Sequence, residues 1–276
     1  MRVSIIFILL LLVSYAAAQE PSTLNPMPNQ QGTLNYTDSN GLRQGPWERY
    51  YANGNPMYKA FFKDNKLVGE MVRYHENGKV MARIVYDKES DNSRGVLFDE
   101  DGKKMAEGAY TGSLKQGEWV FYNTNGVIVG KENYVDNIKH GEAYSYYRNG
   151  AVSSKSDWID GKQNGMETIF YPAGGERLRM SYKDGVLHGP YTVFFENGRR
   201  EIYGMYDHGL MDGPWFFFQS TGVEDYRINY DHGVLIDNNK IDKLQKERFE
   251  EFERNKGKLK DPEDFMKDPD GYMMGR

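Results

Sequence analysis

The chain contains no cysteine, and this absence removes several kinds of chemistry at once. Disulfides, thiolate catalysis and cysteine-bound zinc or iron–sulfur centres are excluded. The Gly-x-Ser-x-Gly elbow, the His-Glu-x-x-His zinc motif and the glycine-rich phosphate loop are missing as well. We therefore expect no catalytic residues, no metal ligands and no cofactor, and we predict that the protein is not an enzyme.

The chain also lacks an apolar run of the roughly 20 residues that a membrane span needs. A shorter run, residues 3–15, follows Arg2 and precedes Ala16-Ala17-Ala18. This order is typical of a secretory signal peptide over residues 1–18, with a membrane anchor as the alternative. We expect an exported protein, periplasmic or secreted to the cell surface, with no stable membrane anchor after cleavage.

Basic residues are fewer than acidic residues. Cleavage after residue 18 removes only Arg2 from 35 basic residues and leaves all 40 acidic ones. The net negative charge of the mature chain argues against nucleic acid as a partner.

Glycine and aromatic residues, by contrast, are abundant, with 30 Gly and 14% aromatic residues. This composition favours β structure with many tight turns. Both residue types recur with a period of 24 residues. The turn glycines are Gly54, Gly78, Gly102, Gly126, Gly150, Gly174, Gly198 and Gly222. The first aromatic column is Tyr50, Tyr74, Phe98, Tyr122, Tyr146, Phe170, Phe194 and Phe218. The second aromatic column is Phe62, Tyr86, Tyr110, Tyr134, Trp158, Tyr182, Tyr206 and Tyr230. A further glycine column, which starts at Gly45, is broken once, by Ser93. These columns indicate eight repeats over residues 40–237.

Each repeat reads as one β-hairpin. The Asn-Gly pairs, such as Asn53-Gly54, predict type I′ turns, whereas Asp160-Gly161 suggests a looser turn between hairpins. Alternation along the strands leads us to expect both aromatic columns on one side of the sheet, packing on each other in place of a second layer. The predicted fold is all-β: an elongated, single-layer antiparallel meander of about eight 24-residue hairpins.

The segments GPWERYYANG (residues 45–54) and YDHGLMDG (residues 206–213) resemble the MORN repeat, and more closely the bacterial MORN-repeat-variant family of YwqK-type, antitoxin-labelled proteins. The likeness extends over about residues 41–237. It implies a twisted sheet of β-hairpins that binds proteins or lipids.

One repeat position is basic in six of the eight repeats. The residues of this basic column are Lys59, Arg83, Lys131, Lys155, Arg179 and Arg227. Alternation places them on the face opposite the second aromatic column. They could follow an anionic polymer or an acidic partner. Alternatively, they form a solvated face that discourages aggregation.

Beside the basic column, Met57, Met81 and Met105 form an apolar strip that later repeats replace with polar residues. Such a strip marks a partner site, or else another part of the chain covers it.

Histidines also recur with the repeat. His208 and His232 are one repeat apart, and His140 and His188 are two repeats apart. Equivalent positions in successive repeats lie about 10 Å from each other, too far to share one metal ion. We therefore interpret these histidines as turn residues.

The ends of the chain depart from the repeat. Residues 19–39 are expected to form a flexible linker. Residues 238–258 have the pattern of an amphipathic helix that caps the last repeat. Residues 259–276 contain two similar Asp-Pro segments, which are a docking motif in duplicate or a disordered tail.

Together these features predict an exported, non-enzymatic repeat scaffold that binds a protein partner in the cell envelope. One alternative is binding of a glycan or another envelope polymer through the aromatic and basic columns. The other is an antitoxin-like immunity protein.

Overall fold

The computed structural model describes residues 32–88 and 90–236. The predicted signal peptide, most of the linker, the capping helix and the C-terminal tail lie outside the described residues. The chain divides into two compact units between Asp91 and Asn92. This division falls at the repeat in which Ser93 replaces the expected glycine.

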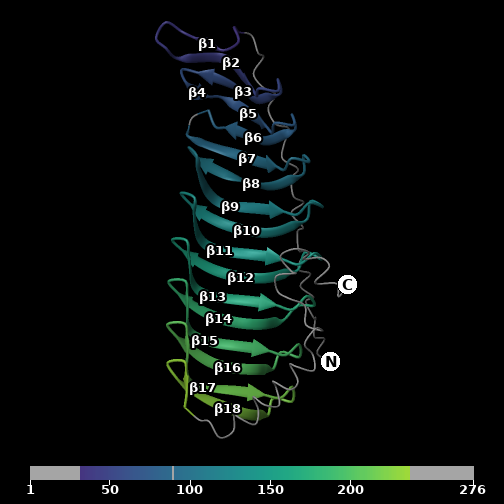
Figure 1. Ribbon diagram of the computed structural model, residues 1–276, viewed down its shortest axis with the longest axis vertical. Coiled ribbons are helices and arrows are strands. Elements are labelled where there is room, and N and C mark those ends of the chain that lie inside the picture. The colour runs from purple at the N-terminus through teal and green to yellow at the C-terminus, as the bar shows by residue number, and fades with distance from the viewer. Residues whose placement is uncertain (1–31, 89, 237–276) are drawn as a thin grey trace, which may run out of the picture. The chain divides into compact units, whose positions relative to one another are not determined.

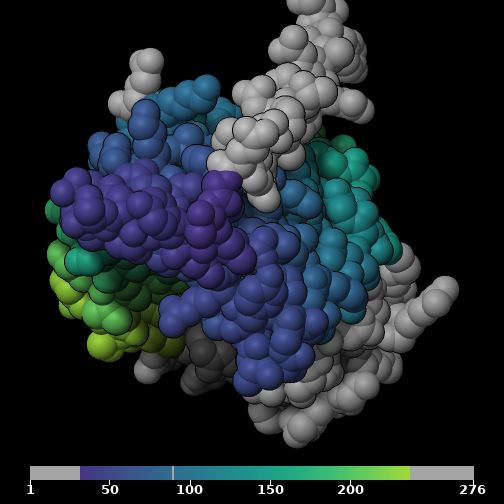
Figure 2. Space-filling view, turned by 90° about the horizontal axis from the view of Figure 1, so that it is seen from above, coloured from purple at the N-terminus to yellow at the C-terminus, as the bar shows by residue number. Residues whose placement is uncertain are grey.

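The first unit contains an antiparallel meander in one layer (Figure 1). Its strands are β1 (Tyr36–Thr37), β2 (Arg43–Tyr50), β3 (Pro56–Lys63), β4 (Lys66–Leu67), β5 (Gly69–Tyr74) and β6 (Val80–Tyr86). β1 pairs with β2, so part of the predicted linker belongs to the sheet. The residues of β1 and β2 (purple) form one continuous patch in the space-filling view of Figure 2.

The second unit continues the same plan. Its strands are β7 (Asn92–Phe98), β8 (Lys104–Thr111), β9 (Leu114–Tyr122), β10 (Ile128–Val135), β11 (Ile138–Tyr146), β12 (Val152–Ile159), β13 (Lys162–Phe170), β14 (Glu176–Lys183), β15 (Val186–Phe194), β16 (Arg200–Asp207), β17 (Leu210–Phe218), β18 (Glu224–Asp231) and β19 (Val234–Leu235). Each strand pairs antiparallel with the next. Strands β9, β11, β13, β15, β17 and β19 begin 24 residues apart, so the predicted hairpin period is confirmed.

The predicted all-β class is confirmed as well, because the described residues contain strands and turns but no helix. Nothing in this part of the chain has the helical length and hydrophobicity of a membrane span.

The two kinds of turn are the reverse of the prediction. At the Asn53-Gly54 turn only Gly54 has a positive φ, 85°, and its N–H donates to the Tyr51 carbonyl at 3.0 Å. This is a type I turn followed by a left-handed glycine, with a register shift between Arg49 and Tyr50. The type I′ prediction is therefore wrong here. It fits the turn between hairpins instead, where Asp160 and Gly161 have φ of 48° and 78°.

Side chains of the Asn-Gly turns also connect one repeat to the next. The Tyr51 hydroxyl donates to the Tyr74 carbonyl at 2.9 Å, and the Asn53 amide donates to the Glu76 carbonyl at 2.8 Å. The Asn53 Oδ1 meanwhile accepts from the Asn55 N–H at 3.0 Å. Equivalent donations join Tyr147 to Phe170, Tyr171 to Phe194, and Asn197 to Ser220. These bonds give a role to the recurring asparagine and to the tyrosine that follows the first aromatic column in three repeats.

The two aromatic columns lie on opposite faces, contrary to the expectation of a shared side. Glu48 faces Lys59 across the strand pair, whereas Gly45 faces Phe62. The Tyr50 hydroxyl hydrogen-bonds Glu48 and therefore lies on the Lys59 side. We call the side with the second aromatic column the aromatic face. The side with the basic column and the first aromatic column is the charged face.

The aromatic face of the second unit supplies its core through tryptophans that cover glycines of the preceding strand. Trp119 is fully buried, and a Cβ added to Gly108 would lie 2.4 Å from its ring. Trp215 is 3% exposed, and a Cβ on Gly204 would lie 2.2 Å from its ring. Tyr110 meets Trp119 edge to face, with ring centroids 4.9 Å apart. Without a second layer, these close contacts exclude water from the sheet.

Gly204→Ala should lower the free energy of unfolding by about 1–3 kcal/mol, since the added methyl group forces the Trp215 ring or the strand to move. Urea unfolding followed by tryptophan fluorescence measures the change. Gly130→Ala is the matched control, because its Cβ would meet only ordinary contacts, the nearest at 3.5 Å. Equal stability of the two variants would contradict this account of the core.

Candidate binding face

The basic column is neutralised along its length by carboxylates. All six predicted residues form ion pairs with glutamates. The pairs are Lys59–Glu48 at 3.1 Å, Arg83–Glu70 at 3.1 Å, Lys131–Glu118 at 3.2 Å, Lys155–Glu142 at 2.5 Å, Arg227–Glu224 at 2.8 Å, and Arg179–Glu176. The hydrogen bond from Lys155 holds the pKa of Glu142 below its usual range. The column therefore presents alternating charges rather than a row of uncompensated cations.

These ion pairs lie at the surface. Exposed fractions of the six basic side chains run from 32% at Lys131 to 56% at Arg227. Pairs with this much exposure stabilise a fold only weakly, so their positions are not dictated by stability. The sequence predicted the cations of this face but not their partners, which come from three different repeat positions.

Aromatic rings of the charged face lie under several of the cations. The Lys104 ammonium is 4.3 Å from the centroid of the Tyr122 ring, and the Arg179 guanidinium is 5.5 Å from that of Phe194. Tyr122 and Phe194 belong to the first aromatic column, which the sequence analysis treated as structural. Exposed contacts of this kind contribute about 0.5–1 kcal/mol each. They hold rings and cations together as one mixed surface.

An aromatic cluster lies on the charged face of the second unit, on strands β16 and β17. Tyr203 stacks on Phe216 with ring centroids 6.2 Å apart, and Phe216 stacks on Phe218 at 6.4 Å. The Arg227 guanidinium lies 5.1 Å from the Phe216 ring, and that of Arg200 lies 5.1 Å from the Tyr203 ring. The sequence signal was available, because Tyr203 occupies a basic-column position.

The methionine strip falls in both units. Met57 and Met81 in the first unit are half-buried, whereas Met105 in the second unit is 46% exposed. A partner-binding role for the strip stays a prediction.

Rings of the aromatic face are largely covered. Phe62 is 5% exposed, and Tyr206 meets Trp215 edge to face with centroids 5.1 Å apart. Burial is the main cause that raises the pKa of Tyr182 to about 12, and it also raises the pKa of Tyr134. Rings packed in this way belong to a core and offer little open surface on which a sugar could stack.

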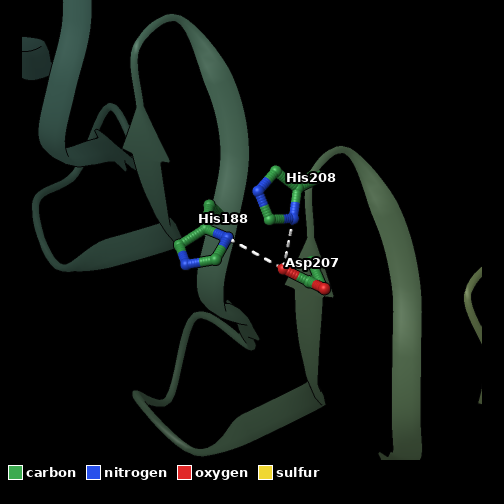
Figure 3. Close-up of side chains that lie close together, drawn as sticks. All are labelled: His188, Asp207 and His208. Carbon is green, nitrogen blue, oxygen red and sulfur yellow. Dashed lines mark ion pairs between the residues drawn. The ribbon is translucent and has the colours of Figure 1, made fainter.

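At the turn edge of the charged face, the structure brings together histidines that the sequence analysis kept apart. His188 and His208 both lie beside Asp207 (Figure 3). The expectation compared only equivalent positions of successive repeats, whereas these residues occupy different positions and meet across one strand pair. In the first unit, Gln44 and Asp64 occupy the repeat positions of His188 and His208, and the Gln44 amide donates to the Asp64 carboxylate.

A single-layer meander of β-hairpins with a polar, mixed-charge face defines a class of protein, the β-hairpin repeat scaffold. Four segments of the chain, residues 43–64, 67–88, 115–136 and 139–160, match the family model described as "MORN repeat variant". The match to this repeat agrees with the resemblance seen in the sequence. No curated protein matches the chain.

Several solved structures give weak likenesses. One is the accessory secretory protein 1,2 and 3 structure from Streptococcus pneumoniae, at 19% identity and TM-score 0.22 over 41% of this chain and 19% of that one. Another is the Photorhabdus luminescens Tc holotoxin pore, at 12% identity and TM-score 0.22 over 71% of this chain and 14% of that one. A third is a porin-like protein from Bacteroides uniformis, at 8% identity and TM-score 0.18 over 69% and 91%. The chain thus spans only a small part of the first two, and likenesses this weak do not bear on its function.

The hydrogen bond with Asp231 is the largest cause that raises the pKa of His232 above 6.5. The protonated His232 imidazole therefore contributes to the stability of the fold below pH 6.5, and this contribution is lost as the pH rises through the raised pKa. Asp231→Asn should lower the pKa of His232 towards 6.5, as measured by NMR titration of the imidazole. Asp225→Asn, a change on the same strand, is the control and should leave the titration of His232 unaltered.

Proposed function

We propose that the protein is an exported, non-enzymatic repeat scaffold that binds a protein partner in the cell envelope. The observation that carries the proposal is the charged face, where compensated charges alternate with aromatic rings. Arginine and aromatic side chains are the residues that protein interfaces favour. The signal-peptide pattern of residues 1–18 supports the location.

Charge compensation favours a protein over an anionic polymer. A uniform polyanion is attracted by net positive potential, yet each cation of the basic column already has a glutamate partner, such as Glu142 beside Lys155. A protein surface with its own pattern of charges can instead match this alternation, which gives specificity.

The aromatic cluster of Tyr203, Phe216 and Phe218 supplies the centre of the proposed interface. Its rings are partly exposed, stacked and flanked by Arg200 and Arg227. Large rings beside arginine are typical of the few residues that dominate binding energy. The ion pairs of the preceding strands would surround this centre.

Photo-crosslinking in envelope extracts tests this face directly. A photoreactive phenylalanine analogue in place of Phe216 should give one dominant crosslinked protein, and Phe216→Ser in a tagged chain should abolish its capture. The analogue in place of Tyr182, on the aromatic face, is the control and should give no such product. Capture that survives Phe216→Ser, or equal crosslinking from both faces, would refute the proposed site.

A polysaccharide column separates this proposal from glycan binding. Because its cations are paired, the wild-type protein should pass through a sulfated polysaccharide resin at about 0.15 M salt. Retention that disappears in the triple variant Lys131→Glu, Lys155→Glu, Arg179→Glu would favour the polymer instead. The triple variant Lys103→Glu, Lys162→Glu, Lys183→Glu makes the same charge change in or beside turns and serves as the control.

A further inference from the structure

The turn edge of the second unit contains a compact group of nitrogen and oxygen ligands. The Asp207 Oδ1 lies 3.1 Å from the His188 Nδ1 and 2.7 Å from the His208 Nδ1 (Figure 3). His188 comes from β15, Asp207 ends β16, and His208 opens the turn into β17. One ligand atom from each residue lies within 4.8 Å of the others. Three potential metal ligands therefore converge from adjoining segments of the fold.

One of these ligand atoms lacks a hydrogen bond. The His188 Nδ1 is buried and has no hydrogen-bond partner, although it faces the Asp207 carboxylate. Buried polar atoms in folded proteins are nearly always satisfied. An unsatisfied imidazole nitrogen that faces a carboxylate and a second imidazole is positioned to accept a bond from a cation.

Other repeats use the same two positions differently. In the second unit the Gln116 amide donates to Asp136, a hydrogen bond that joins the start of β9 to the turn after β10. His140 faces Asp160 at 3.5 Å, and a second histidine is absent from that pair. Histidine occupies both positions only at His188 and His208. The turn does not need two imidazoles in order to form, so this repeat departs from the pattern for another reason.

We propose that His188, Asp207 and His208 bind one divalent transition-metal ion of the zinc class. Imidazole and carboxylate are the ligands that Zn²⁺, Co²⁺ and Ni²⁺ accept. Ligands at about 2.0–2.1 Å from a tetrahedral ion lie roughly 3.3 Å from each other, so the distances from Asp207 to His188 and to His208, 3.1 and 2.7 Å, need to lengthen by about 0.2 and 0.6 Å. The His208 side chain is 80% exposed and is free to make this adjustment. A fourth position stays open to water or to a partner's side chain.

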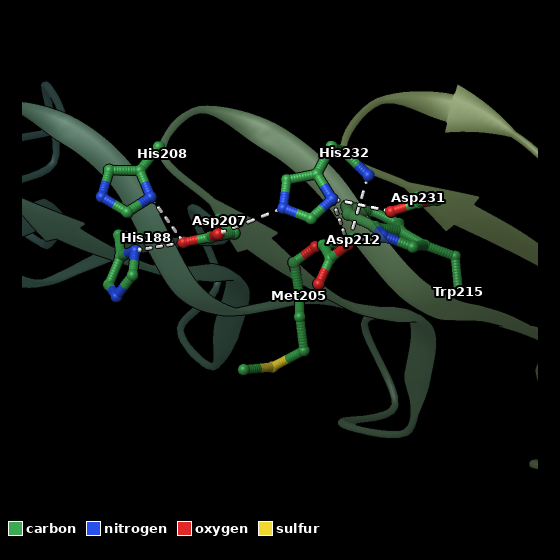
Figure 4. Close-up of polar contacts among 8 residues, drawn as sticks. All are labelled: His188, Met205, Asp207, His208, Asp212, Trp215, Asp231 and His232. Carbon is green, nitrogen blue, oxygen red and sulfur yellow. Dashed lines mark hydrogen bonds and ion pairs between the residues drawn. The ribbon is translucent and has the colours of Figure 1, made fainter.

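Neighbouring groups hold the carboxylate in place. The His232 Nε2 lies 3.9 Å from the other Asp207 oxygen, and the His232 Nδ1 hydrogen-bonds Asp231 at 2.7 Å (Figure 4). The Trp215 indole donates to the Met205 carbonyl at 3.2 Å, which ties the end of β16 to β17. Groups that orient metal ligands in this way commonly affect affinity about 10- to 100-fold.

Cobalt titration of the untagged full-length protein tests the site. All five histidines of the sequence lie in the described residues. Co²⁺ should bind with one equivalent and give visible absorption, and Zn²⁺ should displace it. His188→Gln restores the residue type of Gln116, and His208→Asn places a residue that tolerates the positive φ of 46° at this turn, so both variants should fold. Each should weaken metal binding about tenfold or more, and unfolding midpoints will confirm that the fold is kept.

His140→Gln is the matched control, because it makes the same change at the equivalent position two repeats earlier. It should leave the affinity unchanged. The proposal is overturned if the wild-type chain takes up no Co²⁺ or Zn²⁺, or if His140→Gln weakens binding as much as His188→Gln does. Binding that survives both His188→Gln and His208→Asn would equally overturn it.

Discussion

The packing of an indole ring directly onto bare backbone is the contact on which the second unit depends. A sheet of one layer has no opposing sheet or helix to cover its apolar side, so its own side chains must exclude water. Gly108 and Gly204 allow Trp119 and Trp215 to lie against the neighbouring strand, and tyrosines of the same face surround them. With the core confined to one face, the other face is free to vary, and there the ion pairs and the histidine group lie.

The period of the sequence was sufficient to predict the hairpins, but it could not predict the local geometry of the turns. Asn-Gly commonly indicates a two-residue turn, yet Asn53 bonds the backbone two residues ahead and also bonds the next repeat. Those bonds favour a longer loop. The longer loop nevertheless leaves Glu48 opposite Lys59, as a two-residue turn would, and in that register Tyr50 and Phe62 lie on opposite faces. The prediction of a shared side was wrong because it followed alternation within each strand and not the pairing between strands.

The residues of the candidate binding face could also be predicted only in part from the sequence. The basic column could be read from spacing alone, whereas its glutamate partners occupy three repeat positions, and those that lie on a neighbouring strand become apparent only from the strand register. The histidine group was missed because a comparison of equivalent positions measures the distance between repeats. His188 and His208 are neighbours within one strand pair, and the pairing of Gln44 with Asp64 in the first unit follows the same rule.

The bonds between successive Asn-Gly turns give the chain a chemical direction. Tyr51, Asn53, Tyr147 and Asn197 are all donors, and each acceptor is a carbonyl of the following repeat. A repeat without its predecessor lacks only a donor to its carbonyl, and water replaces that donor readily. A repeat without its successor holds donors that have lost their acceptors, the costlier of the two states when buried. During synthesis from the N-terminus, the half-buried hydroxyls of Tyr51 and Tyr147 therefore gain their protein acceptors only when the next hairpin has been made.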